Sequence, residues 1–236
     1  MKRKSAMARG WSAVAVVLTC LSGMARLGAR EPASVVSTVH NLSVSGPGEV
    51  RSLAETEICK FCHIPHSALE AEPLWGHVLS SVASYEVPDI RAPGGGGTTP
   101  APQPDGSSRL CLSCHDGTVA LGEIGGLPRP IQMAGSQRLT PDRPGFLGTD
   151  LSGSHPISFV PPEVPPVGEG SERDISVRPL GVLRNDPRVR LDEQSKMQCT
   201  TCHDAHADRF FQPDRVPRFW VAPTVSEVCL ACHVLH

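Results

Sequence analysis

Four copies of one short pattern, C-x-x-C-H, constrain this chain more than any other feature of its sequence. They stand at residues 59–63, 111–115, 199–203 and 229–233. Two cysteines three positions apart face the same side of a helical turn, and a histidine follows directly. This is the attachment pattern of c-type haem, in which two thioethers hold one porphyrin edge and the histidine ligates the iron. The sequence therefore predicts four covalently attached haems.

Two other uses of paired cysteines explain the pattern less well. A zinc site takes C-x-x-C pairs but does not need a histidine after every pair. A thioredoxin-like redox pair needs one C-x-x-C in a βαβ setting, which the sequence does not suggest. We therefore expect haem to be held by Cys59, Cys62, His63, Cys111, Cys114, His115, Cys199, Cys202, His203, Cys229, Cys232 and His233.

Six further histidines are available for the opposite faces of the irons, and four suffice if every haem has two axial imidazoles. The expected distal ligands are His40, His66, His155 and His206, and the alternatives are His77 and His236. His66 and His206 each follow a proximal histidine by three residues, so each is expected to reach a neighbouring haem. Outside the first 25 residues only two methionines, Met133 and Met197, are present, so methionine can ligate at most two of the irons.

The composition does not suit an ordinary protein core. Aromatic residues make up only 4% of the chain, while 22 glycines and 23 prolines favour turns and irregular backbone. Four porphyrins would supply the apolar interior that the side chains lack. The expected fold is mostly irregular, with short α-helices wrapped around a stack of four c-type haems.

Short helices are expected where the motifs lie. The segments 52–55 and 224–227 match the capping box that starts a helix, and each precedes a motif. Residues 191–203 have a helical composition, and Gly117 is a plausible helix stop after the second motif.

Two segments between the motifs are low in complexity. Residues 91–108 are expected to be a flexible loop, and residues 160–190 an extended coil stiffened by proline. The last two motifs are separated by the shortest step, so their haems are expected to be neighbours. Trp75 and Trp220 are candidates to pack against porphyrin, although ordinary core burial explains each of them as well.

The first 25 residues predict a cleaved signal peptide, which leaves residues 26–236 as one tetrahaem domain. A basic start is followed by an apolar run too short to span a bilayer comfortably. Lipidation of Cys20 is disfavoured because the bulky Thr19 precedes it. Cleavage lowers Lys+Arg from 22 to 18 against 24 Asp+Glu, a net charge of −6. The expected product is an exported protein, periplasmic or at the cell surface, without a nucleic-acid partner or a membrane segment.

The motifs and their surroundings resemble a family of exported tetrahaem c-type cytochromes from metal-reducing and related bacteria, which includes subunits of extracellular cytochrome filaments. The resemblance begins near residue 38 and rests on HNLSVSGPG, ETEICKFCHIPH, PLWGH, RLCLSCHDGTVALG, DLSGSHPISF, MQCTTCHDAH and EVCLACH. It implies bis-histidine haems in a continuous stack and supports His40, His66, His155 and His206 as distal ligands. One departure is Ala205, where the family pattern has proline.

The expected function is low-potential electron transfer rather than enzyme catalysis, because an iron with imidazoles on both faces has no open position for substrate. Other redox proteins or extracellular acceptors are the expected partners. A monomeric shuttle and a polymerising filament subunit both remain open. The alternative is a multihaem reductase, in which one iron keeps an open face for a small oxyanion.

Overall fold

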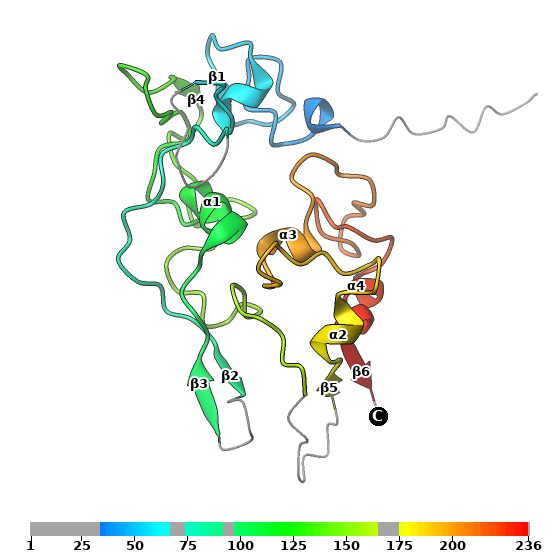
Figure 1. Ribbon diagram of the computed structural model, residues 1–236. Coiled ribbons are helices and arrows are strands. Elements are labelled where there is room, and N and C mark those ends of the chain that lie inside the picture. The colour runs from blue at the N-terminus through cyan, green and yellow to red at the C-terminus, as the bar shows by residue number, and fades with distance from the viewer. Residues whose placement is uncertain (1–33, 67–73, 92–96, 165–174, 236) are drawn as a thin grey trace, which may run out of the picture. The chain divides into compact units, whose positions relative to one another are not determined.

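Most of the described backbone is irregular, and its helices and strands are short (Figure 1). In this computed structural model the described residues are 34–66, 74–91, 97–164 and 175–235. The chain divides into two units, Met1–Arg30 and Glu31–His236, of which the first lies outside the described residues. The predicted signal peptide and His236 therefore lie outside them too, as do parts of the segments 91–108 and 160–190.

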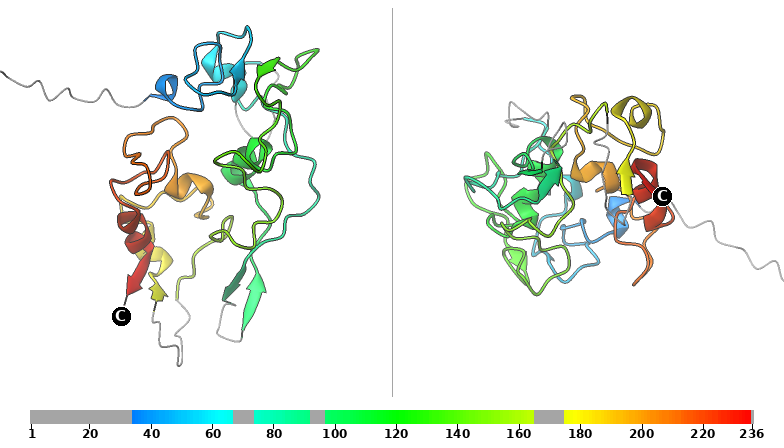
Figure 2. Two further views of the ribbon diagram at one scale, coloured as in Figure 1. Left: turned by 180° about the vertical axis from the view of Figure 1, so that it is seen from behind. Right: turned by 90° about the horizontal axis from the view of Figure 1, so that it is seen from below.

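Each motif is associated with its own short helix. The described helices are η1 Val35–Ser37 and η2 Ile58–Phe61, which are 3₁₀, and α1 Gly106–His115, α2 Leu180–Leu183, α3 Cys199–Cys202 and α4 Val225–Cys232. In space, α1 packs against α3 and α4 lies beside β6, at His233–Leu235 (Figures 1 and 2). The packing of α1 against α3 brings the second and third motifs close together although they are far apart in the sequence.

Three antiparallel strand pairs join parts of the chain. They are β1 Arg51–Ser52 with β4 Met133–Ala134, β2 Asp89–Arg91 with β3 Thr98–Pro100, and β5 Ile175–Val177 with β6 His233–Leu235. In the last pair Val177 lies opposite His233, so the strand begins at the fourth motif histidine. Short strands were not among the predicted elements: β1–β4 and β5–β6 join segments far apart in the sequence, and β2–β3 forms a hairpin between the first and second motifs.

The two predicted capping boxes have different outcomes. Thr224 caps α4, and its hydroxyl accepts a hydrogen bond from the Glu227 backbone at 3.2 Å. The prediction of a helix from Ser52 is wrong, because Ser52 belongs to β1 and the helix begins only at Ile58. The Ser52 hydroxyl does accept from the Glu55 backbone at 2.8 Å, but the Glu55 carboxylate pairs with Lys60 and so does not complete the box.

The helix expected over 191–203 is reduced to the four residues of α3. Asp192 accounts for the difference, because its side chain accepts from the backbones of Gln194 and Lys196 and folds this stretch into turns. Gly117 follows α1 as predicted: its φ of +74° lies in the left-handed region, which suits glycine after a helix.

The described parts of the two low-complexity segments contain more regular structure than predicted. Residues 97–108 form β3 and the start of α1, so the segment 91–108 is not a loop throughout. The segment 160–190 contains β5 and α2, where extended coil was expected. Pro179 explains the second difference, since its φ of −56° suits the residue that starts a helix and leads directly into Leu180.

Side-chain cores are small, as the composition suggested. One buried cluster contains Phe61, Leu121 and Met133, and another contains Tyr85, Leu112 and Leu151. A polar network crosses between α1 and α3: the buried Gln198 side chain bonds to Ser108 at 2.5 Å and to Asp105 at 2.9 Å. Met133 packs inside a core cluster, so its presence is explained without ligation of an iron.

Candidate haem-attachment sites

Each C-x-x-C-H motif occupies the last turn of a short helix. His63 donates its backbone N–H to the Cys59 carbonyl at 2.7 Å, and His203 repeats this bond to Cys199 at 3.0 Å. His233 caps α4 through the same bond to the carbonyl of the first motif cysteine. All eight cysteines of the motifs are free thiols. Each motif therefore holds two thiols on one turn; the chain becomes extended at His203 and His233, whereas His115 is the last residue of α1.

The four motifs adjoin one another in sequence order. Thiols of successive motifs lie near enough to affect one another's ionisation: Cys62 with Cys114, Cys111 with Cys199, and Cys202 with Cys232. Burial raises the pKa of Cys114 and of Cys202 to about 12, because the ionised form is poorly solvated there. The third and fourth motifs lie near each other, which agrees with their short separation in the sequence.

Three predicted proximal histidines each have a predicted distal histidine close by. The ring centroids of His63 and His206 are 6.1 Å apart, those of His40 and His115 are 6.0 Å apart, and those of His155 and His233 are 6.1 Å apart. A metal ion bound about 2 Å from one nitrogen of each ring leaves the centroids about 6 Å apart. Each of the three separations therefore suits two axial imidazoles on one iron.

Backbone carbonyls accept hydrogen bonds from several of these rings. The Nδ1 pairs are His40 with Ala205 (3.1 Å), His115 with Gly145 (2.7 Å), His155 with Pro156 (2.8 Å) and His203 with Arg218 (3.2 Å). An Nδ1–H that donates to a carbonyl leaves the Nε2 lone pair for a metal. Among the described residues, Nδ1 of His63 and of His233 is buried without a partner. Burial lowers the pKa of His40 to about 4, which keeps that ring neutral.

His77 has a different environment from the other histidines. Its side chain is 1% exposed, and its two ring nitrogens lie 2.9 Å from the Val78 carbonyl and 3.1 Å from the Ala120 carbonyl. Its Nε2 also lies 3.4 Å from the Cys114 sulfur. Because a backbone oxygen faces each nitrogen, this arrangement offers neither nitrogen to an iron. His77 therefore fits the role of a buried structural histidine beside the second motif.

His203 is the one motif histidine that makes no ring contact with another histidine in the described part of the chain. Its closest described aromatic neighbour is Trp220, with ring centroids 5.2 Å apart. His66 is exposed and ends the described segment 34–66, and no described contact joins it to a motif histidine. Four distal histidines were expected, and the described residues place three of them beside a motif histidine.

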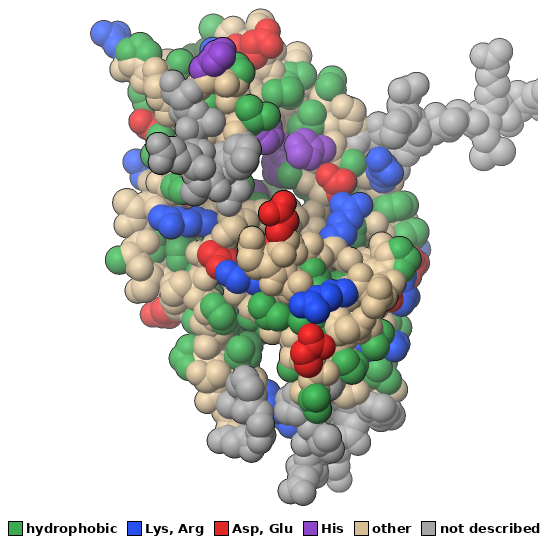
Figure 3. All heavy atoms as spheres, viewed as in Figure 1, with side chains coloured by type: hydrophobic (Ala, Val, Ile, Leu, Met, Phe, Trp, Pro, Cys, Tyr) green, Lys and Arg blue, Asp and Glu red, His purple; other side chains and the backbone are tan. Residues whose placement is uncertain are grey.

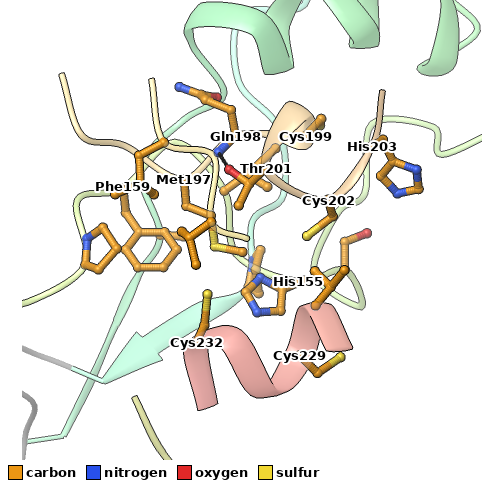
Figure 4. Close-up of a pocket in the computed structure, with 18 of the residues that line it drawn as sticks. His155, Phe159, Met197, Gln198, Cys199, Thr201, Cys202, His203, Cys229 and Cys232 are labelled. Atoms are coloured by element: carbon orange, nitrogen blue, oxygen red, sulfur yellow. Dashed lines mark hydrogen bonds between the residues drawn. The ribbon is translucent and has the colours of Figure 1, made fainter. Parts of the chain in front are cut away.

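An apolar pocket of about 370 Å³ lies between the third and fourth motifs. Figure 4 shows Cys202, Cys232 and His155 around one space, with Met197 and Phe159 beside it. Thiols, imidazoles and aliphatic side chains together suit a flat apolar group that carries a metal at its centre. The residues present therefore fit haem at this site.

The sequence did not reveal how closely the two tryptophans are associated with the motif histidines. The Trp75 ring lies edge-on to His63, at 5.8 Å between centroids and 87° between planes. Trp220 lies edge-on to His203, at 5.2 Å and 83°. Both indoles are half-buried. The only sequence signal was that each tryptophan follows a C-x-x-C-H-x-x-H segment, and the two distances along the chain differ.

Comparison with known protein families finds none that matches the chain, and no curated protein matches it. None of the described helices is long and apolar enough to cross a bilayer. In the described segments no three His, Cys, Asp or Glu side chains converge as a bare metal ion would require, whereas haem iron takes at most two axial ligands from protein. On the face seen in Figure 3, basic and acidic side chains are interspersed.

Proposed function

We propose that this protein transfers electrons through four covalently attached c-type haems. The single observation that carries the proposal is the assembly of three histidine pairs at 6.0–6.1 Å, each pair containing one motif histidine. A chain that used its C-x-x-C-H motifs for another purpose would have no reason to place a second imidazole at this separation. The four motifs in one chain supply independent support.

The chain's own residues would hold and isolate the cofactor. Each cysteine pair would fix one porphyrin edge to a helical turn, and the histidine that follows would ligate the iron. A distal histidine on the other face would exclude substrate and solvent from the iron. When bound, haem with two imidazole ligands supplies reversible one-electron redox chemistry at low potential.

Mass spectrometry and optical spectroscopy of the mature protein test this proposal directly. Production in a host that attaches haem c is expected to give a chain heavier by four haems, with a low-spin spectrum in both redox states. A colourless exported protein, or one whose cysteines are joined as disulfides, would contradict the proposal.

One observation supports a second candidate function. His203 lacks a described histidine partner, so the haem at the third motif can have one open face. Such a site supports the alternative of a multihaem reductase for a small oxyanion. A high-spin ferric signal that is lost when nitrite is added would favour the reductase, and wholly low-spin spectra would favour electron transfer alone.

The exposed His66 also bears on whether the protein is a shuttle or a filament subunit. A histidine exposed on one copy can complete the third site of another copy. Electron microscopy of the exported protein separates the two cases, since filaments are expected only for the subunit and should disappear in a His66→Ala variant. An exported location and redox-protein or extracellular acceptors as partners belong to this proposal.

A further inference from the structure

The first and third motifs belong to a duplicated structural unit that contains a tryptophan. In both copies the motif histidine forms an antiparallel bridge with the tryptophan, His63 with Trp75 and His203 with Trp220. The spacing along the chain differs between the copies, which explains why the sequence alone did not reveal the repeat.

The backbone hydrogen bonds around the bridge are the same in both copies. In the first, the N–H after the histidine donates to Leu74 at 2.8 Å, and Gly76 donates back to Cys62 at 2.8 Å. In the second copy these bonds run from Asp204 to Phe219 at 2.7 Å and from Val221 to Cys202 at 3.1 Å. Each tryptophan is thereby fixed in register with its histidine.

The residue before each tryptophan has an unfavourable backbone conformation. Leu74 has a φ of +65° and Phe219 a φ of +61°. A bulky side chain in the left-handed region costs about 1 kcal/mol or more, and such residues persist only where their surroundings impose the conformation. Its recurrence at equivalent positions indicates that the bend which directs the indole toward the histidine is required in both copies.

The two copies differ in how the indole is anchored. The Trp220 N–H donates to the Thr224 carbonyl at 3.1 Å, which connects it to the residue that caps α4. The Trp75 N–H is buried and has no partner among the described residues. Phe219 also stacks on the His40 ring, with centroids 4.1 Å apart. In the second copy, therefore, Trp220 lies against the motif histidine His203, and Phe219 stacks on the predicted distal histidine His40.

We propose that Trp75 and Trp220 are positioning residues that fix the planes of the His63 and His203 imidazoles. This inference rests on the proposed function, because the orientation of an axial imidazole matters only if the ring ligates haem. An indole edge-on to the imidazole opposes rotation of that ring about its Cβ–Cγ bond. Without this restraint the imidazole of the affected haem would take a range of orientations.

Low-temperature electron paramagnetic resonance of the ferric holoprotein measures this effect, because the g values of a low-spin haem depend on the orientation of its axial imidazoles. Variants Trp75→Phe, Trp75→Leu, Trp220→Phe and Trp220→Leu form a graded series. We expect the ferric signal of one haem to broaden in each variant, more in leucine than in phenylalanine, while the other signals stay unchanged. Trp75→Phe is expected to change least, since it removes no described hydrogen bond, whereas Trp220→Phe also loses the bond to Thr224.

Counting the attached haems by mass spectrometry distinguishes failure of the proposed function from failure of the positioning role. Absence of haem from the wild-type protein would refute the proposed function, whereas four haems with unchanged signals in all variants would overturn only the positioning role. If the leucine variants do not mature, the two phenylalanine variants provide the test. Signals that are not broadened in these variants would also overturn the proposal. The unaltered holoprotein supplies a further measurement: both indole N–H proton resonances should be shifted out of the diamagnetic region, and unshifted resonances would contradict the assignment.

Discussion

The imidazole ring of His63, from the first motif, lies 6.1 Å from that of His206, which follows the third motif, and the two ring planes are inclined by only 15°. At this separation the rings do not touch face to face, so there is space between them for an atom that both could bind. This proximity also brings together the first motif and the segment that follows the third motif. A cofactor held between these rings would therefore link two segments that lie far apart in the sequence.

Replacing His206 with alanine is expected to leave all four haems attached and to convert one of them from low spin to high spin. Attachment depends on the cysteines, whereas the spin state depends on the second imidazole. Haem mass and the ferric high-spin absorption band provide the measurement. A fully low-spin spectrum in the variant would exclude His206 as a ligand.

Replacing His77 with alanine is expected to have the opposite effects. The variant loses a buried ring whose nitrogens lie beside two backbone carbonyls, so the free energy of unfolding should fall by about 2–4 kcal/mol. The low-spin spectrum of the protein that does mature should remain. Thermal melts followed at the haem absorption, compared with those of the His206→Ala variant, distinguish a structural histidine from a ligand.

The midpoint potential of the His40–His115 site is expected to lie below that of the His63–His206 site. Both Nδ1 atoms of the first pair lie within hydrogen-bonding distance of carbonyls, at 3.1 Å and 2.7 Å, which makes the imidazoles more basic and stabilises ferric iron. In the second pair, Nδ1 of His63 has no described partner, and Nδ1 of His206 lies 3.7 Å from the Asp204 carboxylate, beyond hydrogen-bonding distance.

Spectroelectrochemical titration tests this order when each distal ligand is replaced by methionine in turn. Methionine raises the potential of its own haem. The step that moves in His40→Met should start at a lower potential than the step that moves in His206→Met. The reverse order would show that the carbonyl contacts do not control the potentials.

The pairing of Lys196 with Asp105 is expected to contribute stability that depends on pH. Burial opposes ionisation of Asp105, but hydrogen bonds from Lys196 and Gln198 outweigh it and hold the pKa below its ordinary value of 3.8. A depressed carboxyl pKa gives stability that is present above 3.8 and is lost as the pH falls through the lower folded-state pKa. Lys196→Met should therefore lower the Tm by about 1–3 °C at pH 7.

The same variant should have the wild-type Tm once the pH falls well below the ordinary pKa of Asp105, because the carboxyl is then protonated in both proteins. Thermal melts at a series of pH values measure the difference. A Tm difference that stayed constant into acid would mean that Lys196 stabilises the fold through its packing and not through its charge.

Local sequence signals predicted local structure well where one residue decides it. Thr224 starts α4 and Gly117 follows the end of α1, because a hydroxyl cap and a left-handed backbone each depend on single side chains. The signal at Ser52 failed, since the partner carboxylate of Glu55 pairs with Lys60. The strand pairs could not be foreseen, because β1, β4 and the other strands are two or three residues long and carry no periodicity.

For the candidate sites, the motifs identified the cysteines and the proximal histidines as candidates by pattern alone. Which distal histidine lies beside which motif was not predictable, because the pairing of His206 with His63 depends on how distant segments meet. His77 illustrates the same limit: its type and position permitted a ligand, and only its carbonyl neighbours argue against one. The role of the tryptophans became visible only through their bridges to the motif histidines.

Cysteines of successive motifs lie near one another in the order 1, 2, 3, 4: Cys62 near Cys114, Cys111 near Cys199, and Cys202 near Cys232. Under the proposed function the conducting path would then run colinear with the polypeptide, from its first cofactor to its last. Shortening the molecule at its first motif would also remove His40, the proposed distal ligand of the second haem, so the two ends are not equivalent. Removal of the fourth motif alone takes away only the partner of His155 among the described pairs, so the path would be shortened from that end without loss of a ligand at another site.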